Sequence, residues 1–234
     1  MRLFICFHIG YHSVIPDIFP YFEDISKNKD LFDQVFFLVT YQYMSLRIKE
    51  LQERLSSEFL VYFFKVPKRG QDVGGFLYCL NEILDRFLIQ EDDFTLCIHT
   101  KSRKDQLKTL LDSLFKDFRS TIRLFDDSSV GIVGSKKYLI QLDLLNVPDV
   151  ESICSVLNIK PYFLSDTFIA GKIFIIRLSI IDKLMNRDLI KRFYEELEDE
   201  YYTENTRSTK IHSWERMFGI LARHLNYKVV GIDT

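Results

Sequence analysis

Three short patches of the sequence hold polar residues whose types and spacing can do chemistry. Residues 69–75 combine an arginine and an aspartate with three glycines, residues 99–102 are His-Thr-Lys-Ser, and residues 212–216 are His-Ser-Trp-Glu-Arg. Glycine lets a backbone approach an anion closely, and lysine binds phosphate as a point charge. In order along the chain, the patches offer a glycine loop suited to an anion, a basic cluster suited to a diphosphate, and a carboxylate.

Each patch also has a purely structural interpretation. Asp72 can cap the helix that follows the glycines, and the first patch fits neither the GxGxxG nor the P-loop pattern. The basic residues of the second patch can begin a solvated helix. In the third, Ser213 can cap a helix and Trp214 can fall on its core stripe, which leaves the two charged residues exposed. For each patch alone, both interpretations stay open.

The elements that must position these patches follow an α/β pattern. Strands expected at residues 2–9, 34–41 and 58–66 alternate with helical segments at 16–26 and 44–55. The strands are apolar on both faces, which is typical of a parallel sheet covered by helices. We therefore predict the α/β class, with a mostly parallel, doubly wound central sheet flanked by helices.

The second patch follows directly from a predicted strand. A loop at 67–75 leads into a helix at 76–88, and the fourth strand, 94–101, ends in polar residues. In open α/β sheets, ligands bind beyond the carboxyl ends of the strands, so this end is the first place to expect chemistry. The remaining predicted elements are a helix at 105–118, a strand at 130–136, a loop with a short helix at 150–157, a strand at 168–177, an amphipathic helix at 187–202, a polar loop at 203–210, a helix at 212–227 and a strand at 227–232.

Composition narrows the classes of partner. The 234 residues include 31 Lys and Arg against 33 Asp and Glu, so the net charge of −2 gives no general attraction to nucleic acid, and any phosphate site must be local. With 47% hydrophobic residues, the chain can bury the core of one domain. The four cysteines lack zinc-site spacing and are expected to be buried free thiols: Cys6, Cys79, Cys97 and Cys154.

The apolar segments are short. The N-terminal run is shorter than a signal peptide requires, and the longest apolar stretch, 168–181, is interrupted by Lys172 and Arg177. That stretch falls short of the ~20 residues that span a bilayer. We therefore predict no membrane span and a soluble, cytoplasmic protein.

The patches, taken in order, carry a family resemblance. The chain resembles the rhamnan synthesis F family, whose members are polysaccharide-building glycosyltransferases of GT-A architecture. The resemblance implies one GT-A-like domain over residues 1–234, with a nucleotide-sugar-binding half at about 1–104 and an acceptor-binding half at about 105–234. The segments that carry it are residues 69–77, 97–102, 168–177 and 212–216.

The resemblance also implies an activity. A hexose or deoxyhexose, rhamnose among the candidates, would move from a UDP- or dTDP-sugar to a glycan acceptor with inversion. Glu215 is similar in place to the catalytic base of inverting GT-A enzymes, which takes the proton from the acceptor hydroxyl. The implied nucleotide-sugar-binding residues are Arg69, Asp72, His99, Lys101 and Arg216, and the implied acceptor-binding residues are Ala170 and Gly171. For the last two, a buried strand with a glycine bulge is the alternative.

The chain departs from the GT-A pattern at one place. Most GT-A enzymes carry an Asp-x-Asp metal site where this chain has His99 and Lys101, and Mn²⁺ and Mg²⁺ prefer carboxylate oxygens. The diphosphate is then neutralised either by Lys101 and nearby basic residues or by a metal held through His99 and His212. Asp92 and Asp93 are a poorer metal pair because they precede the strand.

Two other classes compete with this interpretation. The missing Asp-x-Asp is compatible with a catalytically inactive GT-A-fold protein that binds carbohydrate or acts as a scaffold. Such a protein would bind no nucleotide sugar. A Rossmann oxidoreductase is disfavoured because no GxG-type loop follows the first strand.

Overall fold

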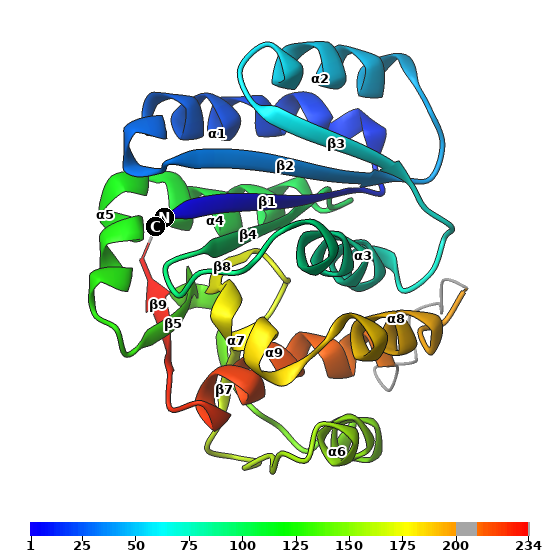
Figure 1. Ribbon diagram of the computed structural model, residues 1–234, viewed down its shortest axis with the longest axis vertical. Coiled ribbons are helices and arrows are strands. Elements are labelled where there is room, and N and C mark those ends of the chain that lie inside the picture. Colours follow the sequence, from blue (N-terminus) through cyan, green and yellow to red (C-terminus); the bar gives the residue numbers. More distant parts are fainter. Residues whose placement is uncertain (200–209, 234) are drawn as a thin grey trace.

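The computed structural model describes residues 1–199 and 210–233. Its main sheet is built from β1 Arg2–Ile9, β2 Gln34–Tyr41, β3 Leu60–Lys65, β4 Phe94–His99, β5 Val130–Ser135, β8 Phe174–Arg177 and β9 Lys228–Ile232. The strand order is β3-β2-β1-β4-β8-β5-β9 (Figure 1). Neighbouring strands are parallel except at β8, which lies antiparallel between β4 and β5. The predicted α/β class with a mostly parallel sheet is confirmed.

Helices cover both faces of this sheet. One face carries α1 Ile15–Lys27, α2 Leu46–Ser56, α4 Lys104–Phe115 and α5 Phe118–Arg123. The other carries α3 Gln71–Arg86, α7 Leu178–Leu184 and α9 Lys210–His224, with α8 Arg187–Glu195 packed on α3 and α6 Val147–Val156 packed on α9. A second, two-stranded sheet pairs β6 Leu139–Gln141 with β7 Thr167–Ile169. Short 3₁₀ turns lie at His12–Val14, Lys29–Leu31, Leu124–Asp126 and Lys136–Tyr138.

The strand residues divide between two cores. Along β1, Phe4 and Cys6 face the core under α3 and α9, whereas Leu3, Ile5 and Phe7 face the core under α1 and α4. Successive side chains of a strand point to opposite faces, so a strand covered on both sides must be apolar at nearly every position. The unbroken apolar runs in the sequence have this origin.

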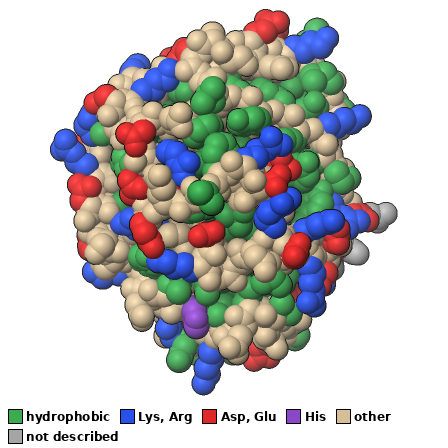
Figure 2. All heavy atoms as spheres, viewed as in Figure 1, with side chains coloured by type: hydrophobic (Ala, Val, Ile, Leu, Met, Phe, Trp, Pro, Cys, Tyr) green, Lys and Arg blue, Asp and Glu red, His purple; other side chains and the backbone are tan. Residues whose placement is uncertain are grey.

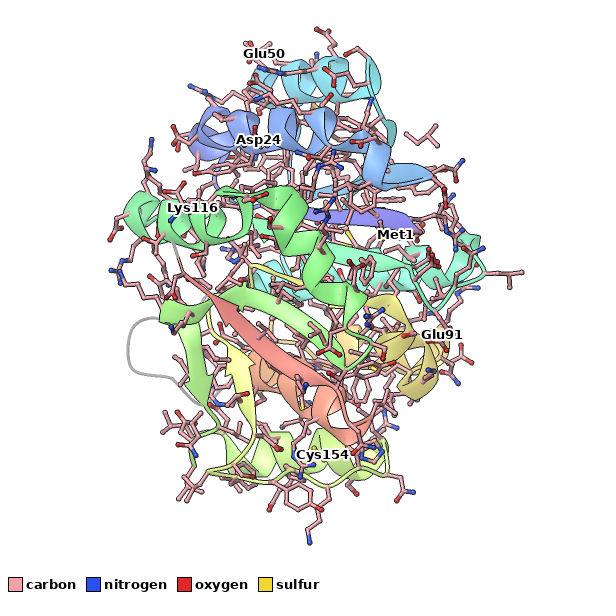
Figure 3. The ribbon with its side chains drawn as sticks, turned by 90° about the vertical axis from the view of Figure 1, so that its left-hand side faces the viewer. Met1, Asp24, Glu50, Glu91, Lys116 and Cys154 are labelled. Carbon is pink, nitrogen blue, oxygen red and sulfur yellow. The ribbon has the colours of Figure 1, made fainter. Side chains whose placement is uncertain are left out.

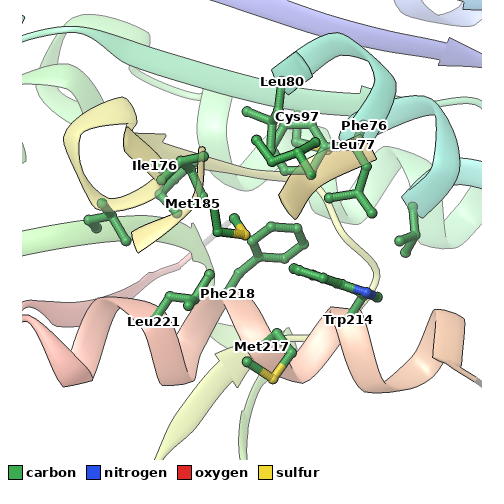
Figure 4. Close-up of a cluster of buried hydrophobic side chains, with 14 of the residues drawn as sticks. Phe76, Leu77, Leu80, Cys97, Ile176, Met185, Trp214, Met217, Phe218 and Leu221 are labelled. Carbon is green, nitrogen blue, oxygen red and sulfur yellow. The ribbon is translucent and has the colours of Figure 1, made fainter. Parts of the chain in front are cut away.

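Helix α9 is held in place by large apolar side chains. Figure 4 shows Trp214 and Phe218 pointing from α9 toward α3, where the Phe218 ring lies 5.1 Å from that of Phe76. Met217 points the other way, and its sulfur lies 3.8 Å from that of Cys154 on α6. The apolar stripe of α9 therefore fixes the direction in which the intervening polar residues point.

Two sequence-based assignments were wrong. The single strand expected at 168–177 is two strands in different sheets, because Gly171 (φ +88°) and Lys172 (φ +54°) adopt left-handed conformations that turn the chain between β7 and β8. The stretch 67–75 is not a loop throughout. Helix α3 already begins at Gln71, so the glycines at 74 and 75 lie within its first turns.

The prediction for the cysteines is confirmed, and one further helix is shorter than expected. The four cysteines are buried and free, as predicted. The helix expected at 187–202 is too long, because α8 ends at Glu195 and residues 196–199 are not helical; most of the polar loop expected at 203–210 falls outside the described residues. Within the described ranges, no helix is both long and apolar enough to cross a bilayer.

The surface agrees with the near-neutral charge. In Figure 2, acidic and basic side chains are interspersed over the viewed face. Figure 3 shows α1 with Asp24 and α2 with Glu50 at one end of the molecule, and α6 with Cys154 at the opposite end. No large patch of one sign covers this face.

Candidate active site

A cavity of about 840 Å³ lies beyond the carboxyl ends of β1 and β4. Strand β1 pairs with β2 on one side and with β4 on the other, so the strand order reverses here, which is where open α/β sheets form ligand crevices. The cavity takes side chains from both halves of the chain. Its lining is His8, Gly10, Tyr11, Gln42, Lys68, Gln71, Asp72, His99, Thr100, Lys101, Ser102, Arg103, Gln106, Ala170, Gly171, Lys172, His212 and Glu215.

Most of the site residues expected from the sequence meet in this cavity. They come from the start of α3, the end of β4, the turn between β7 and β8, and the start of α9. Those that line it are Asp72, His99, Lys101, Ala170, Gly171, His212 and Glu215.

The two expected arginines are not among the lining residues. Arg69 pairs with Asp199, with 2.7 Å between Nε and Oδ1, and donates to the carbonyl of Glu195. Arg216 is buried, pairs with Asp143 at 3.0 Å, and lies over the ring of Phe168. Both guanidinium groups are therefore occupied by protein partners, and the structure does not bring them to the other predicted residues.

Thr100 joins the loops that follow β1 and β4. Its hydroxyl oxygen accepts hydrogen bonds from the backbone N–H groups of Gly10 and Tyr11, at 2.9 and 2.7 Å, and its own N–H donates to the carbonyl of His8. A buried threonine hydroxyl that accepts two hydrogen bonds holds the two loops together. This side of the cavity is therefore one connected unit.

Asp72 is the centre of a buried charged network. Its two carboxylate oxygens lie 2.9 Å from Lys172 Nζ and 3.1 Å from His99 Nε2. Burial alone would raise the pKa of Asp72, but Lys172 and the other positive groups outweigh it and hold that pKa well below its usual range. Asp72 is an anion throughout the physiological pH range.

His99 is a neutral ring in this network. Burial lowers its pKa to about 3 despite the nearby Asp72. Its Nδ1 lies 3.2 Å from one acceptor, the carbonyl oxygen of Thr100, whereas its Nε2 lies 2.9 Å from the carbonyl oxygen of Gly171 and 3.1 Å from the Asp72 carboxylate. The proton therefore belongs on Nε2, which faces two acceptors, one of them charged. His99 therefore links the end of β4 to the β7–β8 turn.

The same turn orients Glu215. The N–H of Gly171 donates to a carboxylate oxygen of Glu215, which projects from α9. His212 lies three residues earlier on the same helix face, and burial lowers its pKa. The turn thus fixes the carboxylate that the sequence singled out.

Several lining residues were missed from the sequence. His8 and Lys172 lie inside apolar strand patterns, Lys68 and Arg103 lie just outside the patches, and Gln71 lies within the first patch but had no assigned role. For His8, a usable signal existed, because a polar residue next to the carboxyl end of a parallel strand points toward the usual ligand crevice. Lys172 offered no such signal, because its position depends on an unforeseen turn.

His8 is packed against α3. Its Nδ1 lies 3.0 Å from the hydroxyl of Thr40, and burial lowers the pKa of the ring to about 4. Gly75 is the residue that α3 presents to this ring. Close approach of the helix to β1 therefore depends on the missing side chain at 75, which gives the glycine a packing role.

No protein-family model matches the chain, and no curated protein matches it. Among solved structures, the crystal structure of S. aureus TarS 1–349 is similar, with 11% sequence identity and a TM-score of 0.47. The match covers 99% of this chain and 58% of that chain, so this chain spans less than two thirds of its length. A likeness of this extent carries no argument about activity. The rhamnan synthesis F resemblance stays a prediction.

The donor set of the cavity does not fit Mn²⁺ or Mg²⁺. Such ions bind through one or two carboxylates together with substrate phosphates and waters, and the carboxylates in the lining are Asp72 and Glu215. Asp72 is bound by Lys172 and His99, and the proton on His99 Nε2 blocks that nitrogen as a ligand. Over residues 1–199 and 210–233, no three His, Cys, Asp or Glu side chains are grouped to hold a metal.

Replacing Gly75 by alanine should destabilise the protein. The added Cβ would lie 2.3 Å from His8 Nδ1 and 2.5 Å from Cγ of the same ring. Since the ring is held by Thr40, α3 must shift, and we expect a loss of about 1–3 kcal/mol in the free energy of unfolding. Urea denaturation measures it. Gly10→Ala is the matched control, because its Cβ meets nothing closer than 3.9 Å; equal stability of the two variants would contradict this packing role.

The buried histidines predict a loss of stability on mild acidification. His8 and His99 have pKa values near 4 and 3 when folded and near 6.5 when unfolded, so below about pH 6.5 only the unfolded chain binds these protons. The free energy of unfolding should therefore fall between pH 6.5 and 4, by up to about 1.4 kcal/mol per pH unit for each ring. Urea denaturation at pH 7 and 5 measures the slope. His8→Asn should make it shallower, and an unchanged slope would show that His8 does not contribute.

Proposed function

We propose that this protein is a glycosyltransferase that moves a hexose or deoxyhexose, rhamnose among the candidates, from a nucleotide-diphosphate sugar to a glycan acceptor with inversion. One observation carries the proposal. A single cavity at the reversal point of the sheet combines basic side chains that suit a diphosphate with a carboxylate, Glu215, that a backbone amide orients.

The size and charge of the cavity suit this ligand. Its volume of about 840 Å³ falls in the range of small-molecule sites. Among the described lining residues, the cations outnumber the carboxylates two to one, although the protein as a whole is close to neutral. A local excess of positive charge supports binding of an anion such as a diphosphate.

The fold supports a GT-A-like architecture for the proposed enzyme. The mostly parallel seven-stranded sheet, with helices on both faces, is compatible with one nucleotide-diphospho-sugar transferase domain over residues 1–234. In the proposal, residues before about 104 supply most of the donor side, and the β7–β8 turn and α9 supply the acceptor side. The donor would be a UDP- or dTDP-sugar.

In the proposed reaction, the acceptor hydroxyl attacks the anomeric carbon while the bond from that carbon to the diphosphate oxygen breaks. Glu215 accepts the hydroxyl proton, and the electron pair of the broken bond leaves with the nucleoside diphosphate. Lys101, which follows the carboxyl end of β4, faces the departing charge. Ala170 and Gly171 leave room for the acceptor sugar. Attack opposite the leaving group inverts the anomeric centre.

A thermal-shift screen against UDP-, dTDP- and GDP-sugars tests the proposal, because a ligand that binds only the folded state raises the apparent stability. We expect a selective shift with one nucleotide and slow hydrolysis of that donor without acceptor. Lys101→Ala should weaken the shift, whereas Lys49→Ala, on the exposed face of α2, should not. Failure of every nucleotide sugar to bind would overturn the proposal.

A catalytically inactive carbohydrate-binding or scaffolding protein is the second candidate. The engagement of Arg69 and Arg216 by Asp199 and Asp143 favours it, because two of the expected donor-binding groups are occupied elsewhere. Such a protein would bind a glycan but no nucleotide sugar. The same screen, extended to oligosaccharides, separates the two candidates.

A further inference from the structure

Lys172 places a positive charge at the bottom of the cavity. Its side chain is about one tenth exposed, and its Nζ lies 2.9 Å from a carboxylate oxygen of Asp72. Its charge also interacts favourably with Glu215, the other carboxylate of the lining. The ammonium of Lys172 thus pairs directly with Asp72 and is also stabilised, at longer range, by Glu215.

The backbone is built to hold this lysine. Lys172 itself has φ +54°, in the left-handed region, directly after Gly171 at +88°. A lysine adopts that region at a cost, and burying its ammonium costs more unless the charge is paired. Lys172 thus combines an unfavourable backbone conformation with a buried charge, and it lines the cavity. That is the pattern expected where strain serves a site.

Three further cations line the same cavity. Lys101 and Arg103 follow β4, and Lys68 precedes α3. The pKa of Lys101 is lowered by burial, with Asp72 opposing the shift. Because Asp72 is already paired with Lys172 and His99, it does not need Lys101 to neutralise it, and Lys101 can meet a ligand anion.

We infer that this site binds a diphosphate group without a divalent cation, with the buried ammonium of Lys172, paired with Asp72, supplying the positive charge that a metal ion would otherwise supply. The inference rests on the proposed function and adds how its donor is recognised. Lys101, Lys68 and Arg103 contact the diphosphate oxygens. When the bond to the sugar breaks, the electron pair and its negative charge pass to the diphosphate, where these cations stabilise it.

Binding of pyrophosphate, UDP and dTDP to the full chain, by calorimetry in EDTA and again with Mn²⁺, tests this inference. We expect binding in EDTA with affinity within about threefold of that in Mn²⁺. Binding that appears only with Mn²⁺ would overturn the inference and leave the proposed function standing. Failure of all three to bind in either condition would overturn both.

A Lys172→Ala variant tests whether Lys172 supplies the charge that makes a metal ion unnecessary. We expect Lys172→Ala to weaken binding in EDTA at least about tenfold, and Mn²⁺ to strengthen binding to this variant but not to the wild type. Unchanged affinity in EDTA would show that Lys172 does not take the place of a metal. Lys49→Ala is the matched control, and thermal unfolding checks that each variant is folded. If Lys172→Ala does not fold, the wild-type comparison still decides the question of metal.

Discussion

A Glu215→Gln variant should transfer sugar about 10²- to 10⁴-fold more slowly than the wild type, which is the usual contribution of a general base. The amide cannot accept the acceptor proton. Its oxygen can still accept the hydrogen bond from the N–H of Gly171, so the turn and the cavity should be kept. Transfer to a glycan acceptor, followed at saturating donor, measures the effect, which should appear in kcat.

Two comparisons make this result specific. The variant should bind the nucleotide sugar with nearly wild-type affinity, because the loss lies in proton transfer. Glu50→Gln is the matched control and should transfer at the normal rate, because Glu50 is exposed on α2 at one end of the molecule and does not line the cavity (Figure 3). Full transfer by Glu215→Gln would refute the assignment of the base.

Asp72→Ala should be among the most destabilising single changes, with a loss of about 3–5 kcal/mol in the free energy of unfolding. The substitution leaves the buried ammonium of Lys172 without its partner and removes the acceptor beside His99. The folded pKa of Asp72 is depressed, so its contribution is present above the unfolded pKa near 4 and is lost only at lower pH. Urea denaturation at pH 7 measures the loss.

A second substitution tests the cause of that loss. Asp72→Ala combined with Lys172→Met removes the unpaired charge and should recover a large part of the stability. On the same helix, Asp85→Ala breaks only an exposed pair with Arg187 and should cost less than about 1 kcal/mol. If Asp72→Ala were as mild as Asp85→Ala, the buried network would not hold α3 to the β7–β8 turn.

The regular elements could be predicted from sequence because their signals are local. Strand β2 spans residues 34–41, as its apolar run indicated. The break between β7 and β8 could not be predicted, since the apolar residues continue through it and only the left-handed backbone at 171 and 172 reveals the turn. The early start of α3 was masked by glycines, which usually end helices.

The site was predictable only where a motif lay at the end of a strand or helix. Four residues stood out by type in the sequence, and the fold brings them together in the cavity: Asp72, His99, Lys101 and Glu215. The sequence indicated Arg69 as a site residue just as clearly, yet Arg69 pairs with Asp199, which is 130 residues away in the sequence. Partners at such separations depend on tertiary packing, which no local pattern contains.

The position of β8 has a consequence for synthesis on the ribosome. Strand β4 ends at residue 99, but its partner β8 begins only at residue 174, and α9 supplies Glu215 later still. At about 5–20 residues per second, the free edge of β4 waits about 4–15 s for its neighbour. During that interval the nascent chain exposes the unpaired edge of β4 and has no complete cavity, so it is then most prone to pair with other chains.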